Sequence, residues 1–381
     1  MPPPRATRTL VSTAAFLSLA ACAPDVGSTS TDAERIVASE NLRIGEADGA
    51  PEVTFGRIAG LARDPKGRML VVDVQAHEVR VFERDGRYAF TFGREGEGPG
   101  ELRRPCCPAF GPDGLLWIRD SGNRRYDAFL VGDTSAESRG QIRMEHGDNN
   151  RWVATTFDED GSLIDVGGGV DSAGQRIFNI RFSRSRDDSL VRRLDVREPP
   201  ADSLSIHEVP REVAGGRAIY YFHQPHGPVH AVGHGPRGEW AQAVSSRYAI
   251  AWRAPDGSLL RTITRDVLGP PLSAAERTRA DSSIARDERA AGGALPFDVP
   301  ERKPPIRYLY FDDAGRLWVE RSVAEDAPRE ADVWSRDGTL VFTLEWPADV
   351  SLSEGWRGEH EAIGIARDEL GVERVVRLSW E

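Results

Sequence analysis

The chain has 381 residues, with 49 Lys and Arg against 60 Asp and Glu and a formal net charge of −11. This acidic balance excludes the basic surface that nucleic-acid-binding proteins use to neutralise phosphates, and the length exceeds the needs of one small core. An apolar share of 39% and a charged share of 29% are typical of a soluble globular protein. The 38 Gly and 25 Pro favour a turn-rich, all-β fold.

The N-terminus has the pattern of a signal peptide over residues 1–21. Arg5 and Arg8 precede an uncharged, largely apolar run at 10–21, which is too short to span a bilayer. The run ends in Leu-Ala-Ala followed by Cys22, which resembles a bacterial lipobox. We therefore expect Cys22 to be lipidated, the alternative being an ordinary secretory signal that contains a cysteine.

The small, polar residues at 22–34 predict a flexible tether between the lipid and the folded domain. By resemblance to known lipoproteins, Ala23 after the cysteine favours the outer membrane, on its periplasmic face or at the cell surface. The membrane is thus an expected partner, through the N-terminal lipid. Export also implies an oxidising compartment.

A turn followed by a short apolar strand recurs along the rest of the chain. The glycines of these six turns are Gly67, Gly114, Gly161, Gly238, Gly315 and Gly371. A second turn follows several of them after about 20 residues, as at Asp85-Gly86, and two hairpins in a period of 45 to 50 residues are what a four-stranded propeller blade requires. We therefore predict an all-β fold, a six-bladed β-propeller over residues 35–381 with a short helical insertion.

Two motifs carry a resemblance to a known family. Asp120, Gly122, Asn123, Arg125 and Phe129 match the NHL-repeat consensus. The loop at 96–102, Gly-Glu-Gly-Pro-Gly-Glu-Leu, is similar to the Gly-x-Gly-Pro-Gly-Glu-Phe loop of bacterial six-bladed β-propeller lipoproteins. The resemblance implies the fold and is silent on activity.

The ends of the domain and the two longest intervals between successive turn glycines complete the expected architecture. The chain ends ten residues after the sixth turn, so an N-terminal strand near 35–45 is expected to supply the missing outer part of the last blade. Within a predicted insertion at 270–304, a capping box begins at Ser273, helix formers run to Ala291, and two glycines stop the helix. The polar stretch at 187–222 is interpreted as long loops of blades three and four.

Propeller topology brings one set of loops together at one end of the channel, and this end is the predicted ligand face. The candidate residues on it are His77, Arg94, Glu101, Cys106, Cys107, Asn123, Arg124, His223 and His226. A divalent metal held by His223, His226 and His77 is one hypothesis, because histidine is a common zinc ligand. Loop histidines in ordinary hydrogen bonds are the alternative.

Cys106 and Cys107 are adjacent, and two alternatives remain open for them: a vicinal disulfide, or two buried reduced thiols. Asp73 and Asp120 are interpreted as caps of the turns that follow them. The loop at 96–100 is interpreted as a tight turn, since it lacks the Lys-Ser/Thr of a phosphate-binding loop.

Two functions fit this pattern. The first is an envelope-anchored module that binds an unknown small molecule, glycan or protein. The second is a metal-dependent enzyme resembling propeller lactonases or amidating lyases. The chain contains no Gly-x-Ser-x-Gly, His-Glu-x-x-His or Cys-x-x-Cys motif, and binding is the favoured function.

Overall fold

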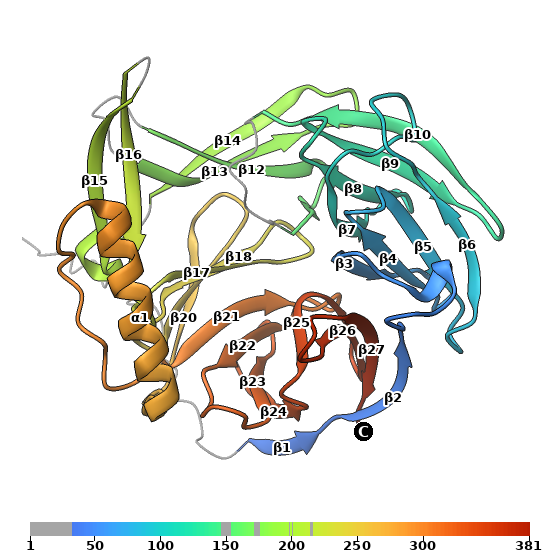
Figure 1. Cartoon of the computed structure of the whole chain (residues 1–381). Helices are drawn as coiled ribbons and strands as arrows, with labels where there is room; N and C mark the ends of the chain where they lie inside the picture. The colour runs from blue at the N-terminus through green and yellow to red at the C-terminus, as the bar shows by residue number, and fades with distance from the viewer. Residues whose placement is uncertain (1–32, 146–153, 171–175, 198, 200, 214–215) are drawn as a thin grey trace, which may run out of the picture.

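The computed structural model describes residues 33–145, 154–170, 176–197, 199, 201–213 and 216–381. Figure 1 shows six blades arranged in a ring, which confirms the predicted six-bladed propeller. Each blade is an antiparallel meander that runs from an inner to an outer strand. The inner strands of neighbouring blades face one another around a central channel.

The first three blades have the following strands. Blade one contains β3 (Ile58–Arg63), β4 (Met69–Asp73), β5 (Glu78–Phe82) and β6 (Tyr88–Phe92). Blade two contains β7 (Pro105–Phe110), β8 (Leu116–Asp120), β9 (Arg125–Val131) and β10 (Ala136–Arg143). Blade three contains β11 (Thr156–Phe157), β12 (Leu163–Val170), β13 (Arg176–Arg184) and β14 (Leu190–Arg197).

The last three blades have the following strands. Blade four contains β17 (His230–His234), β18 (Trp240–Val244), β19 (Ala249–Arg253) and β20 (Leu259–Thr264). Blade five contains β21 (Ile306–Phe311), β22 (Leu317–Arg321), β23 (Arg329–Trp334) and β24 (Leu340–Trp346). Blade six contains β25 (Val350–Arg357), β26 (Glu361–Arg367) and β27 (Glu373–Ser379), with β2 (Ser39–Ile44) at its outer edge.

The N-terminal segment joins the last two blades. β2 pairs antiparallel with β27, and the preceding β1 (Glu34–Val37) pairs parallel with β24 of blade five. The interpretation of Gly371 as a sixth first turn is wrong, because this glycine lies between β26 and β27, the second and third strands of the blade. The last blade therefore takes only its outermost strand, β2, from the N-terminal segment, and the C-terminal segment supplies its other three strands.

Two insertions extend the ring on one side. The predicted helix forms as α1 (Ala274–Ala291), with a capping box between Ser273 and Glu276 and a left-handed Gly292 (φ 75°) at its end. The interpretation of 187–222 as loops is wrong, because this stretch contains β14 and a hairpin of β15 (Ile206–Val213) and β16 (Gly216–His223). Short 3-10 turns lie at Pro51–Val53 and Ala201–Leu204.

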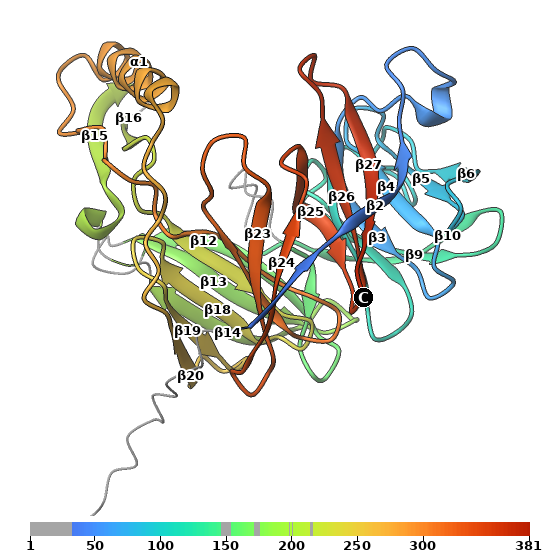
Figure 2. The same cartoon turned by 90° about the horizontal axis from the view of Figure 1, so that it is seen from below.

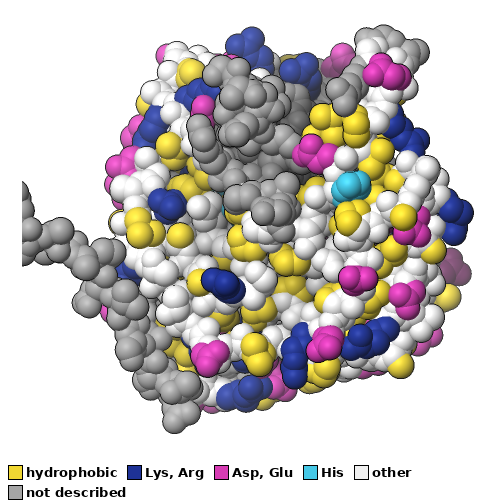
Figure 3. All heavy atoms as spheres, turned by 90° about the vertical axis from the view of Figure 1, so that its left-hand side faces the viewer, with side chains coloured by type: hydrophobic (Ala, Val, Ile, Leu, Met, Phe, Trp, Pro, Cys, Tyr) yellow, Lys and Arg dark blue, Asp and Glu magenta, His cyan; other side chains and the backbone are white. Residues whose placement is uncertain are grey.

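The two insertions meet each other, and we call β15, β16, α1 and residues 292–305 the crown. The Arg211 guanidinium donates to the carbonyl of Ala290, and the Gln224 amide donates to the carbonyl of Asp298. Figure 2 shows the crown rising beside the ring. On this side of the molecule, hydrophobic side chains are interspersed with charged ones of both signs (Figure 3).

Apolar side chains fill most seams between blades. A cluster between blades five and six includes Trp318, Phe342 and Trp380, and comparable clusters lie between blades one and two, two and three, four and five, and six and one. The seam between blades three and four differs in the described residues. There the buried Arg181 of β13 donates to His234 of β17.

Candidate functional site

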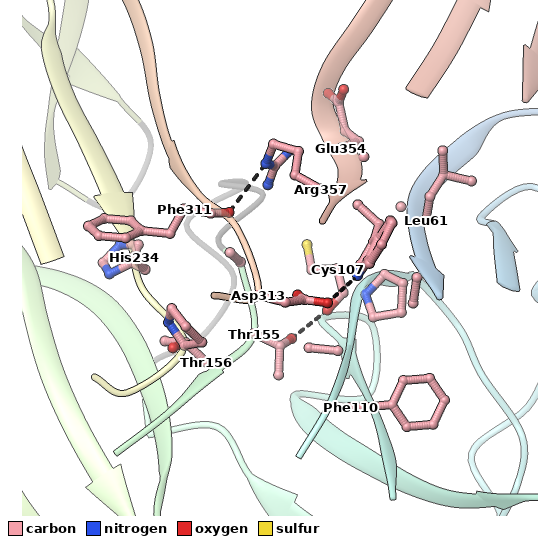
Figure 4. A pocket seen from close by; sticks show the side chains of 18 of the residues that line it. Leu61, Cys107, Phe110, Thr155, Thr156, His234, Phe311, Asp313, Glu354 and Arg357 are labelled. Carbon is pink, nitrogen blue, oxygen red and sulfur yellow. Dashed lines mark hydrogen bonds between the residues drawn. The ribbon is translucent and has the colours of Figure 1, made fainter. Parts of the chain in front are cut away.

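A cavity of about 370 Å³ lies in the central channel (Figure 4). Its walls come from the inner strands or adjoining turns of all six blades. They include β3, β7, the segment 154–157, the ends of β17 and β21, and residues 353–357 of β25. Most of these are the later parts of inner strands, so the cavity lies toward the end of the channel that carries the first turns. The predicted ligand face is at the other end.

Arg357, the last residue of β25, forms side-chain hydrogen bonds only with neutral groups among the residues that the structure describes. Its Nε donates to the carbonyl of Phe311 at 3.3 Å, and Nη1 donates to the carbonyl of Leu352. Its guanidinium carbon also lies 4.7 Å from the ring centroid of Tyr310. Burial lowers the pKa of Arg357, which is the direction expected when a charge is taken from water.

Asp313 and Trp356 meet at the cavity wall. The indole Nε1 of Trp356 donates to Oδ2 of Asp313 at 2.6 Å. The guanidinium of Arg63 lies over the Trp356 ring at 5.0 Å and pairs with Glu361 at 2.9 Å. Burial raises the pKa of Asp313, and the Trp356 hydrogen bond opposes this shift only in part. The same three residues, Arg63, Asp313 and Trp356, also border an open groove beside blade six.

His234 lines the cavity from the end of β17 and is held neutral. Arg181 approaches Nδ1 of the imidazole at 2.6 Å, and because a guanidinium only donates, Nδ1 accepts and the ring proton is on Nε2. Burial lowers the pKa of His234 well below its usual value, and the charge of Arg181 lowers it further. His234 is therefore a hydrogen-bond donor at Nε2 near neutral pH.

The two adjacent cysteines form part of the cavity wall. The structure joins Cys106 and Cys107 in a disulfide, with Cα atoms 3.7 Å apart. Cys106 is buried in the core, whereas Cys107 lines the cavity and its carbonyl accepts a hydrogen bond from Thr155 at 2.5 Å. Gly60 permits this close packing, because a Cβ there would lie 2.4 Å from Cδ of Pro108.

Three of the predicted ligand-face residues gather in one rim structure. Arg94 pairs with Glu101 at 2.8 Å, and Glu101 accepts from the backbone of Gly98, which holds the loop as a tight turn. The Asn123 amide donates to the carbonyl of Gly96 and to the carboxylate of Asp120. Asp120 also accepts from the backbone N–H groups of Arg103 and Arg104, so it joins the turn that follows it, through Asn123, to the loop that precedes β7.

The remaining candidates are dispersed. His77 and Arg124 occupy equivalent loops of blades one and two, both with positive φ (58° and 55°). His223 ends β16, and His226 lies beside the crown, where burial lowers its pKa and the charge of Glu276 opposes the shift. Cys22 lies outside the described residues. Of the predicted set, only Cys107 lines the channel cavity.

No three His, Cys, Asp or Glu side chains in the described part of the chain are grouped to hold a metal ion. His77 lies on blade one, whereas the charges that act on His226 are those of Glu276, Lys303 and Arg279. The structure therefore brings His226 to the crown rather than to His77. Within the same described ranges, no helix is long and apolar enough to cross a membrane.

Sequence reasoning missed Arg357, Asp313 and Thr155. They come from blades six, five and three, respectively, and they share no spacing that could mark them as a group. Their position in the fold is the one signal that could have indicated a place in the channel, because each of these residues lies on or beside an inner strand. His234 lies at the end of the inner strand β17, and the structure puts it in the cavity wall.

No protein-family model matches the chain, and no curated protein matches it. A solved structure of a Bacteroides fragilis protein described as exported shares 10% identity at a TM-score of 0.51, covering 91% of this chain and 95% of that chain. Virginiamycin B lyase from Staphylococcus aureus shares 10% identity at a TM-score of 0.40, covering 89% and 98%. At these identities the likeness to the first structure shows the propeller fold alone.

Proposed function

We propose that this protein is an exported β-propeller that binds a small molecule in its channel cavity. The observation that carries the proposal is the cavity itself, in which all six blades place both apolar walls and convergent polar groups. Its volume of about 370 Å³ is within the range of small-molecule sites. The polar groups of Arg357, His234 and Thr155 are fixed by hydrogen bonds to the protein, so a ligand would meet a largely preformed site.

The proposed location is the bacterial envelope, with the chain anchored through a lipid on Cys22 at the outer membrane. The support is the lipobox-like end of the signal segment and the similarity of the loop at 96–102 to that of propeller lipoproteins of the NHL-repeat type. Labelling cells with an alkyne fatty acid tests this location. Label should enter the full chain and be absent from Cys22→Ala, and equal labelling of both would overturn the anchor.

A fragment screen by ligand-observed NMR tests the cavity. The Ala154→Trp variant places an indole at an exposed position of the cavity lining, and Ala249→Trp places one on an exposed position of β19 as a control. We expect fragments that bind the wild-type protein to lose binding to Ala154→Trp and to keep it with Ala249→Trp. Equal melting temperatures would show that both variants fold.

The proposal fails if no fragment binds at millimolar concentration. It also fails if Ala154→Trp leaves every bound fragment in place, because the fragments would then occupy another part of the molecule. Either result is independent of where the protein is anchored.

A further inference from the structure

The half-buried Arg357 differs in its partners from two other arginines of this fold. At the same end of the channel, Arg68 pairs with Asp64 at 2.7 Å and Arg316 pairs with Asp312 at 2.6 Å. Arg357 has no carboxylate oxygen within 4 Å anywhere in the described residues. Two of its N–H groups donate to carbonyls, and a guanidinium has five, so three (5 − 2) remain available.

The nearest acidic side chains do not provide that missing partner. Asp312 forms an ion pair with Arg316, and Glu320 forms one with Arg329 at 3.1 Å. Asp313 accepts a hydrogen bond from the indole of Trp356. Arg357 is half-buried and lines the cavity, so an anion bound there would meet N–H groups that no carboxylate of the described residues pairs with.

We infer that the ligand of the channel cavity carries one carboxylate, which the guanidinium of Arg357 receives. The inference rests on the proposed function, since it names the class of molecule that the same cavity takes. A guanidinium edge matches a planar carboxylate in geometry as well as charge. Figure 4 shows Arg357, Asp313, Thr155 and Cys107 around the central space.

The rest of the cavity restricts the remainder of the ligand. Leu61, Phe110 and Pro236 provide apolar wall, which favours an uncharged hydrocarbon or aromatic body. Asp313 and Glu354 also line the cavity, so a second negative charge on the ligand would lie near acidic groups. The class that fits is a monocarboxylate with an apolar body.

Benzoate and benzamide are suitable probes because they have nearly the same shape and differ in charge. Isothermal titration of the purified protein should show benzoate binding at least tenfold more tightly than benzamide. Arg357→Met should remove this difference, and Arg357→Lys should retain part of it. Arg84→Met is the matched control, since Arg84 is 66% exposed and borders the neighbouring groove rather than the cavity.

The outcomes separate this inference from the function on which it rests. If benzoate and benzamide bind the wild-type protein equally and Ala154→Trp removes both, the cavity binds small molecules and the carboxylate inference is wrong. If neither probe nor any other fragment binds, the proposed function fails as well. The wild-type comparison needs no variant, so it decides the matter even if Arg357→Met does not fold.

Discussion

Two seams of the ring are held together by different chemistry. Between blades five and six, Trp318 packs against Phe342 and Trp380 with ring centroids 6.5 and 5.8 Å away, and all three side chains are buried. Between blades three and four, the buried Arg181 contacts His234 and lies over Trp240. One seam relies on burial of apolar surface, and the other contains a buried charge.

The difference coincides with the way the chain passes between blades. β24 is joined to β25 by a short connection, and β1 covers the outer edge of β24. The chain from β14 to β17 instead leaves the ring to form the β15–β16 hairpin of the crown. The chain therefore leaves the ring at the polar seam, as it also does between blades four and five, where α1 is inserted. The polar seam contributes His234 to the cavity wall.

The largest effect is expected in the apolar seam. Trp318→Ala should lower the free energy of unfolding by about 3 to 5 kcal/mol, because it removes a fully buried indole and leaves a cavity between two blades. Urea unfolding followed by circular dichroism measures this loss. Trp318→Phe is the graded control and should cost less, since it keeps an aromatic ring in the cluster. A loss below about 1 kcal/mol for the alanine variant would contradict the role of this seam.

The second effect is a pH dependence of the polar seam. His234 is neutral in the folded protein, whereas an unfolded histidine takes up a proton below about pH 6.5. The contribution of His234 to the free energy of unfolding is complete above that pH. It is lost as the pH falls toward the lower pKa of His234 in the folded state. In this pH window, the free energy of unfolding should fall by about 1.4 kcal/mol for each pH unit.

The His234→Asn variant isolates this contribution from that of the acidic groups. Asn retains an acceptor for Arg181 and does not titrate, so the variant should lose less stability than the wild type between pH 7 and pH 5. Urea titrations at each pH provide the measurement, and His360→Asn at an exposed position controls for the substitution itself. Parallel pH profiles for wild type and His234→Asn would show that the seam is not pH-sensitive.

The architecture could be predicted because it is local and repeated. An Asp-Gly type of turn beside apolar strands predicts each blade. The capping box at Ser273 predicts the helix. Gly371 was wrongly assigned to a turn between first and second strands, because the same kind of turn also joins second and third strands. The hairpin was missed because β15 contains Pro210, which argues against a central strand, and a two-stranded sheet has only edge strands.

The cavity could not be predicted in the same way, because it is made by ring closure. Arg357, Asp313, His234 and Thr155 are brought together only when all six inner strands meet, and no local pattern distinguishes them from similar residues elsewhere. The sequence did identify a rim, where Asn123 and Glu101 organise a tight loop. Asn123 is engaged with Asp120 and the carbonyl of Gly96, and Glu101 with Arg94 and the backbone N–H of Gly98.

The smallest effect on global stability is expected in the crown, where the insertion at the polar seam meets the insertion between blades four and five through exposed contacts. Arg211 donates to the carbonyl of Ala290 and lies 5.4 Å from the Tyr220 ring, so Arg211→Ala should cost less than about 1 kcal/mol of unfolding free energy. Amide hydrogen exchange should nevertheless become several-fold faster in β15 and β16, because their docking to α1 opens independently of the ring. Arg193→Ala on β14, whose exposed pair with Asp195 lies outside the crown, is the matched control and should leave that exchange unchanged. Unchanged exchange in Arg211→Ala would mean that the hairpin is held by the ring itself, and the two seams would then differ in chemistry without differing in mobility.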